Sequence, residues 1–111
     1  MRVSSRQELI AFLDEFTAHH RGLRRGLMFG RPAIYAGRRL CAFLDEDGLL
    51  IRLPADVARR EIAAGAQPHS RGGRASGAWL RYAPRTPAAA RRLAPLLEVA
   101  VRHAAGRQPP L

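Results

Sequence analysis

The sequence is poor in residues that cross-link a chain or anchor it in a membrane. Among 111 residues it has one cysteine, no lysine, 6% aromatic residues and no run of 18 apolar residues. One cysteine cannot form a disulfide within the chain, and a membrane-spanning helix needs about 20 successive apolar residues. The N-terminal residues turn polar and acidic where a signal peptide needs an unbroken apolar stretch. These absences predict a cytoplasmic protein that crosses no membrane.

The residues that are present suffice for one domain. Hydrophobic residues make up 47% of the chain, and although 20 of them are alanine, 32 larger apolar side chains remain. A chain of this length buries enough surface to fold as one unit. We expect a single domain over residues 1–111, with its core at about 5–105.

Hydrophobic periodicity predicts both helices and strands. Leu9, Phe12, Leu13 and Phe16 recur at helical spacing and predict a helix over 5–20. Short apolar runs with turns at 37–38 and 45–48 predict strands between 27 and 53, and 78–82 predicts a last strand. Strands joined by such short turns are antiparallel.

Proline and glycine mark the remaining boundaries. We expect a short middle helix over 54–65, a surface loop over 67–77, and a C-terminal helix from Pro87 to about Ala105. Pro95 removes an amide donor inside that helix and predicts a kink or break. The predicted class is therefore α+β: an antiparallel sheet of about four to five short strands with an N-terminal, a middle and a C-terminal helix.

Positive charge is the strongest compositional signal. The chain has 19 arginines against 9 acidic residues, a formal net charge of +10. Arginine pairs bidentately with phosphates and carboxylates, so an acid-free arginine stretch is a candidate contact surface for nucleic acid or an acidic protein. The alternative is a solvated surface that reflects GC-rich codon usage and binds nothing specific. The candidate contact residues are Arg21, Arg24, Arg25, Arg31, Arg38 and Arg39.

Residues typical of catalysis do not form a recognisable set. Cys41 lies in an apolar run, which predicts a buried thiol with a raised pKa. His19 and His20 are adjacent on a helix, where their side chains point in different directions and cannot chelate one metal. The carboxylates of 45–47 are interpreted as turn formers. The aromatic residues are not interleaved with arginines along the chain, as a platform for stacking single-stranded bases would require.

We therefore assign no catalytic, cofactor-binding or metal-ligating residue and predict a protein that is not an enzyme, with no cofactor and no small-molecule substrate. One alternative stays open, a small enzyme or ligand-binding protein, which a pocket holding a carboxylate of shifted pKa beside Arg52 or Arg81 would favour. A second alternative is a homodimerising protein–protein module that pairs through an exposed sheet edge.

Several short motifs follow one another in a fixed order. Met28-Phe29-Gly30 is followed by Tyr35, then by Gly37 and an apolar strand through Phe43, then by Asp47-Gly48-Leu49. In this order and spacing the chain resembles the TfoX N-terminal domain family of small bacterial proteins, over about residues 5–105. The residues that carry the family motif are Met28, Phe29, Gly30, Tyr35, Gly37, Phe43 and Gly48.

The resemblance implies an antiparallel sheet packed with helices and regulatory or accessory work rather than catalysis. The namesake of the family acts in transcriptional control of competence in bacteria. This chain looks like a single-domain member that lacks the C-terminal helical domain of full-length TfoX proteins. We expect a non-enzymatic regulatory or interaction module that acts through a basic surface.

Overall fold

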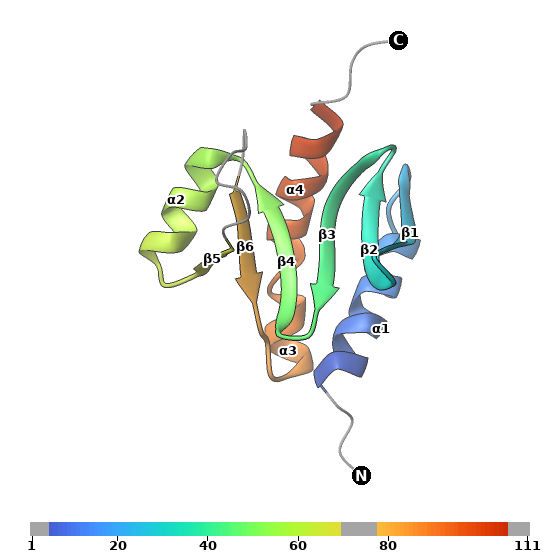
Figure 1. Ribbon diagram of the computed structural model, residues 1–111, viewed down its shortest axis with the longest axis horizontal. Helices are drawn as coiled ribbons and strands as arrows, with labels where there is room; N and C mark the ends of the chain where they lie inside the picture. Colours follow the sequence, from blue (N-terminus) through green and yellow to red (C-terminus); the bar gives the residue numbers. More distant parts are fainter. Residues whose placement is uncertain (1–4, 70–77, 107–111) are drawn as a thin grey trace.

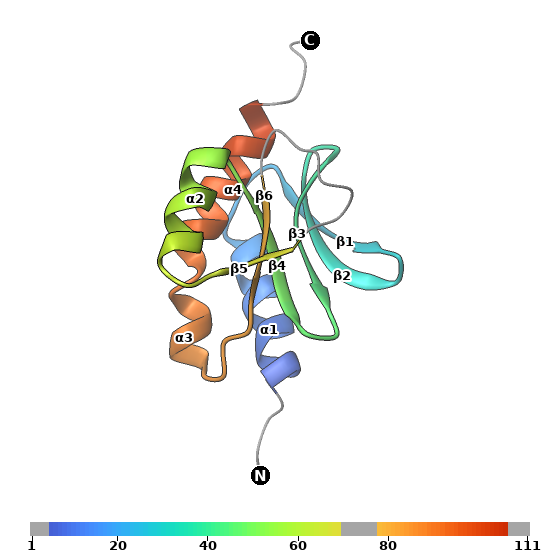
Figure 2. The same ribbon diagram turned by 60° about the vertical axis from the view of Figure 1, so that its left-hand side comes forward.

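The chain folds into two layers, a sheet and a set of helices that cover one of its faces. The computed structural model describes residues 5–69 and 78–106. Figure 1 shows the sheet with the helices behind it, and Figure 2 shows all four helical segments on the same side. The predicted α+β class with an antiparallel sheet is confirmed.

The sheet has six strands in the order β1-β2-β3-β4-β6-β5, and every neighbouring pair is antiparallel. The first four strands follow one another as a meander with short turns, and β6 returns to pair with β4. The strands are β1 (Leu23–Met28), β2 (Arg31–Ala36), β3 (Arg39–Asp45), β4 (Gly48–Leu53), β5 (Gln67–His69) and β6 (Ala78–Tyr82).

Six strands exceed the predicted four to five because β5 was not predicted, and the bounds of β1 also differ from the prediction. β1 begins at Leu23 rather than at Leu27, and Phe29 lies in the turn after it. At the other edge, Gln67–His69 pairs with β6 although it was predicted as loop. Edge strands tolerate residues such as Gly26 and Pro68, which obscure a strand pattern. The rest of the predicted loop, 70–77, lies outside the described residues.

The helices are α1 (Ser5–Ala18), α2 (Ala55–Ala63), α3 (Pro87–Arg91) and α4 (Ala94–Gly106). α1 and α2 lie where they were predicted, each ending two residues earlier. The predicted C-terminal helix is broken at 92–93, as expected near Pro95. Pro95 falls in the first turn of α4, where a missing amide donor leaves no hydrogen bond unmade.

One hydrophobic core joins the helices to the sheet. In β4, Leu49, Ile51 and Leu53 point to the helix layer and are fully buried, which is the period-two pattern of a half-covered strand. α1 contributes Leu9 and Leu13. Burying each such side chain stabilises the fold by about 1.5–3 kcal/mol.

The other face of the sheet carries no helix within 5–69 and 78–106 (Figure 2). We call it the open face. A smaller hydrophobic cluster lies there, with Phe43 and Leu50 buried at its centre. Ala33 is also buried in it, and four partly buried side chains pack around these residues: Met28, Tyr35, Leu40 and Trp79.

Candidate functional site

Two chain reversals bring arginines together at one end of the sheet. The first runs from α1 through Arg21 and Gly22 into β1, and the second runs from β2 through Gly37 and Arg38 into β3. The Gly37 amide donates to the Gly22 carbonyl oxygen at 3.4 Å, so the two reversals are neighbours. Both glycines have positive φ (81° and 62°), a backbone conformation that tight turns require and that glycine adopts without strain.

The strands that leave these reversals add two more arginines. Arg24 is opposite Tyr35, and Arg39 is opposite Ala36 in the sheet register. The Arg24 guanidinium lies 4.5 Å from the centre of the Tyr35 ring, in cation–π contact on the open face. We call the set of Arg21, Arg24, Arg38 and Arg39 the basic end.

The basic end has little opposing charge. The sequence has no Asp or Glu between Phe16 and Leu44. Arg21 and Arg38 are exposed, and within the described part of the chain neither has an ion-pair partner. Their charge is therefore directed to solvent rather than to a neighbouring carboxylate.

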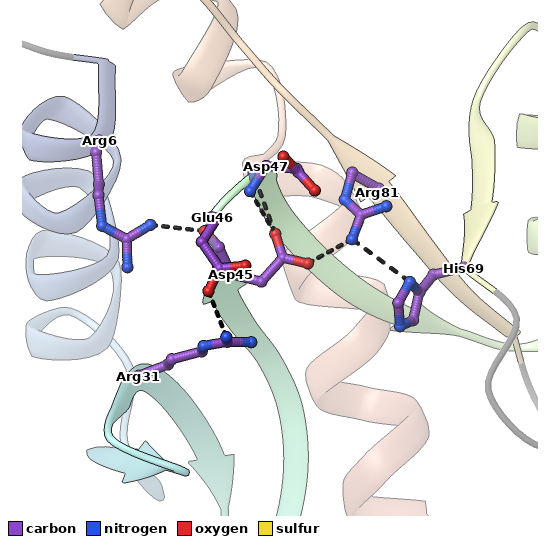
Figure 3. Close-up of polar contacts among 8 residues, drawn as sticks. Arg6, Arg31, Asp45, Glu46, Asp47, His69 and Arg81 are labelled. Atoms are coloured by element: carbon purple, nitrogen blue, oxygen red, sulfur yellow. Dashed lines mark hydrogen bonds and ion pairs between the residues drawn. The ribbon is translucent and has the colours of Figure 1, made fainter.

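The other two predicted contact residues do not join the basic end. Arg25 points to the helix layer, where its Nε lies 2.5 Å from an Asp14 carboxylate oxygen. Arg31 lies at the opposite end of β2 and forms an ion pair with Glu46 (Figure 3). The six predicted arginines are thus split into four that share one end of the sheet and two that carboxylates neutralise elsewhere.

On the open face, aromatic residues and arginines are interleaved in space although they are separated along the chain. Arg24 stacks on Tyr35, and Arg52 is opposite Trp79 across the β4–β6 pair. Trp79 also packs edge-on against Phe43, with ring centres 5.3 Å apart. Spacing along the chain does not show this arrangement, because it arises between residues on different strands. The interleaving depends on the β4–β6 register, which no local pattern reveals.

Asp45, at the end of β3, is the one buried charged residue of the described chain, with 7% of its surface exposed. Its Oδ1 accepts hydrogen bonds from the backbone amides of Asp47 (2.8 Å) and Gly48 (3.0 Å). Its Oδ2 forms an ion pair with Arg81, which also lies 3.5 Å from His69 Nδ1 (Figure 3). The prediction that this carboxylate forms the turn is confirmed.

These contacts keep Asp45 ionised. Burial on its own would raise the pKa of Asp45, but the hydrogen bond from Arg81 and those from the turn amides outweigh burial, and the pKa is lowered. Three donors and burial leave this carboxylate little capacity to act on a substrate. We interpret Asp45 as a structural clamp on the β3–β4 turn.

Beside this turn is a small cavity of about 200 Å³. Arg6 and Arg85 line it together with Glu46 and Asp47, over an apolar floor that includes Leu9. Ligand pockets usually have volumes of about 300–1,000 Å³. This cavity is below that range, and its two arginines are matched by two carboxylates, so it does not favour the ligand-binding alternative.

Cys41 is fully buried, and burial raises its pKa to about 11, which confirms the predicted inert thiol. His19 Nδ1 donates to the Glu15 carbonyl oxygen at 2.8 Å. His20 donates to the Phe16 carbonyl oxygen and to Glu98 Oε2, at 2.8 and 2.6 Å. The hydrogen bond to Glu98 is the main reason why the pKa of His20 is raised. The two histidines thus serve separate helix contacts.

No three metal-ligating side chains gather within the described ranges. In the same ranges, no helix has the length and apolar character needed to cross a bilayer.

The family-motif residues cluster on β1–β4. Met28, Tyr35 and Phe43 belong to the hydrophobic cluster of the open face. Gly30, Gly37 and Gly48 lie at turns with positive φ. A Cβ on Gly48 would lie 2.5 Å from the Tyr82 carbonyl oxygen, so only glycine fits. Phe29 alone of the motif projects into solvent, with 88% of its surface exposed.

No protein-family model, no curated protein and no solved structure matches this chain. The resemblance to the TfoX N-terminal domain family stays a prediction from the motif.

Proposed function

We propose that this protein is a non-enzymatic interaction module that binds nucleic acid through the basic end. The observation that carries the proposal is that Arg21 and Arg38 flank the Gly22–Gly37 backbone hydrogen bond on neighbouring chain reversals, and neither arginine has a carboxylate partner within the described residues. Arginines that lack carboxylate partners are available to displace the counterions of a phosphate backbone, which is the main source of sequence-independent affinity.

The neighbouring open face favours nucleic acid over an acidic protein. Arg24 of the basic end stacks on Tyr35, and Trp79 is half-buried on the same face. Flat aromatic and guanidinium groups can stack on bases or sugars in addition to the phosphate contacts.

The resemblance to the TfoX N-terminal domain suggests the process in which the protein would act. The protein would act as an accessory in bacterial transcription or competence regulation, in the cytoplasm, by holding nucleic acid rather than by changing it. The buried, inert Cys41 and the clamped Asp45 agree with a role outside catalysis.

The test compares duplex and single-stranded DNA binding by fluorescence anisotropy at about 50 mM salt, where phosphate contacts are strongest. Arg21→Glu/Arg38→Glu is expected to weaken binding by at least about tenfold, because two phosphate contacts become two repulsions. The matched control is Arg59→Glu/Arg60→Glu, which changes the net charge equally at two exposed positions on α2.

Equal weakening by both double variants would mean that overall charge, not the basic end, drives binding. Absence of binding to either DNA at this salt concentration would remove nucleic acid as the partner. Binding of an acidic protein would then be the remaining hypothesis for the function of these arginines.

A further inference from the structure

β1 is an edge strand with free hydrogen-bonding capacity. Among the described strands it pairs only with β2. The two-residue turn closes on the Met28–Arg31 pair, and in an antiparallel ladder every second pair exchanges hydrogen bonds. The Gly37–Gly22 hydrogen bond continues this alternation, because the Gly22–Gly37 pair lies six residues along the ladder from Met28–Arg31. The backbone groups of the intervening β1 residues, Leu23, Arg25 and Leu27, therefore point away from β2. The Leu27 carbonyl oxygen accepts a hydrogen bond from the Tyr35 hydroxyl at 3.2 Å and has one lone pair left for a further donor.

β1 and the turn that follows it carry the two most exposed large apolar side chains of the described residues. Leu27 is 66% exposed, and Phe29, in the turn that follows, is 88% exposed. Phe29 also has φ of +52°, a left-handed conformation that a side chain other than Asn, Asp or Gly rarely adopts. Phe29 thus combines backbone strain with an unburied ring, and neither helps the isolated chain to fold.

We propose that the β1 edge is the docking surface for a second copy of this chain. The two β1 strands would pair antiparallel about a twofold axis at Gly26, so that two six-stranded sheets become one continuous sheet. In this register Arg25 is opposite Leu27 of the second copy, and Phe29 covers Leu23 of the second copy. The outward backbone groups gain partners, and both exposed apolar side chains are buried.

Charge favours this arrangement over other pairings of the edge. The basic end lies where β1 starts, and the exposed turn residues Glu46 and Asp47 lie at the other end of the sheet, linked to β2 by the Arg31–Glu46 ion pair. Antiparallel pairing therefore keeps the basic ends of the two copies apart, at opposite ends of the joined sheet. A parallel pair would place the arginines of β1 side by side.

Arg25 does not oppose the pairing. Its guanidinium is already neutralised by Asp14 on the helix side of the sheet. Figure 2 shows the β1–β2 hairpin extending away from the helix layer, so the helices of the described chain leave this edge accessible.

The experiment is sedimentation equilibrium of the full chain from about 10 µM to about 1 mM, without nucleic acid, because a short strand contact supports only a weak dimer. Salt at about 0.5 M screens surface charges and separates this association from the proposed nucleic-acid binding, which such salt abolishes. The chain is expected to reach a monomer–dimer equilibrium in this range.

Two substitutions test the surface. Phe29→Asn keeps the turn, because Asn adopts the left-handed conformation readily, and Leu27→Thr keeps the strand. Each is expected to weaken dimerisation by at least about tenfold through lost apolar burial. Ile62→Thr is the matched control, since Ile62 is an exposed apolar residue on α2, and it should leave the dimer unchanged.

The amides of Arg25 and Leu27 report the register directly, since they should become protected from hydrogen exchange as the protein concentration rises. A chain that stays monomeric throughout this range overturns the proposal. So does a dimer that persists in either Phe29→Asn or Leu27→Thr, or that Ile62→Thr weakens equally. All of these outcomes are independent of whether the basic end binds DNA.

Discussion

Two turns at the same end of the sheet reverse the chain in different ways. The β3–β4 turn, Glu46–Asp47, is clamped by the buried Asp45 carboxylate through two backbone amides and Arg81. The β1–β2 turn, Phe29–Gly30, has positive φ at both residues and an exposed phenylalanine. The Asp45 side chain satisfies the backbone of the first turn, whereas the left-handed backbone at Phe29 disfavours a phenylalanine.

The difference separates a residue that stabilises the fold from one that is available for contact. Asp45 satisfies the backbone it turns, so its contribution is to stability. Phe29 occupies a position where Asn or Gly would be more stable, and an exposed ring gains no burial in a monomer. Violations of local preference concentrate at functional sites.

Removing the clamp should have the largest effect. Asp45→Ala leaves Arg81 and two turn amides without their acceptor and is expected to lower the free energy of unfolding by about 2–4 kcal/mol. Urea denaturation followed by Trp79 fluorescence measures it. Asp45→Asn keeps the oxygen that accepts from the turn amides but loses the ion pair, and should cost less. Equal stability of Asp45→Ala and the parent chain would contradict the clamp.

Acid should act on the same turn. The pKa of Asp45 is lowered from 3.8 in the folded protein, so the folded state binds this proton less readily than the unfolded state does. The stabilisation is complete above pH 3.8 and is lost as the pH falls through the lower folded pKa. Unfolding midpoints should fall more steeply below that pH in the parent chain than in Asp45→Asn. Parallel pH profiles would show that other carboxylates dominate.

Phe29→Asn should have the opposite sign. Relief of left-handed strain is expected to raise the free energy of unfolding of the monomer by about 1 kcal/mol, or about 4 °C in Tm. Thermal unfolding at low protein concentration, where the monomer prevails, measures it. A loss of stability would mean that the phenylalanine ring supports the fold, and the contrast between the two turns would disappear.

The smallest effect concerns His20. Because Glu98 accepts its Nε2 hydrogen bond, the pKa of His20 lies above 6.5, and Glu98→Gln should lower it in an NMR titration. The linked stabilisation is present below pH 6.5 and is lost as the pH rises through the raised pKa. It should stay under about 1 kcal/mol, since solvent screens the half-exposed Glu98. A His20 pKa unchanged in Glu98→Gln would contradict the hydrogen bond.

Local patterns predicted the elements whose signal lies within one segment. The stripe of Leu9, Leu13 and Phe16 predicted α1, and Pro95 predicted the break before α4. β1 was predicted to start only at Leu27 and β5 was predicted as loop, because pairing on one side suffices to hold Gly26 and Pro68 in a strand.

The candidate site was predicted only in part for the same reason. An acid-free stretch identifies arginines, but which of them meet depends on register and on strand pairing. The turn at Gly37–Arg38 returns the chain beside Arg21, whereas alternation along β1 sends Arg25 to the helix side and Asp14. Neither outcome can be deduced from the count of charges.

The salt dependence of DNA binding tests the basic end most directly. The slope of log K against log salt reports the number of phosphate contacts. Arg21→Glu/Arg38→Glu should reduce its magnitude by about two relative to the parent chain, whereas Arg59→Glu/Arg60→Glu should leave it unchanged. An identical slope in all three proteins would contradict the assignment of nucleic-acid binding to this end of the sheet.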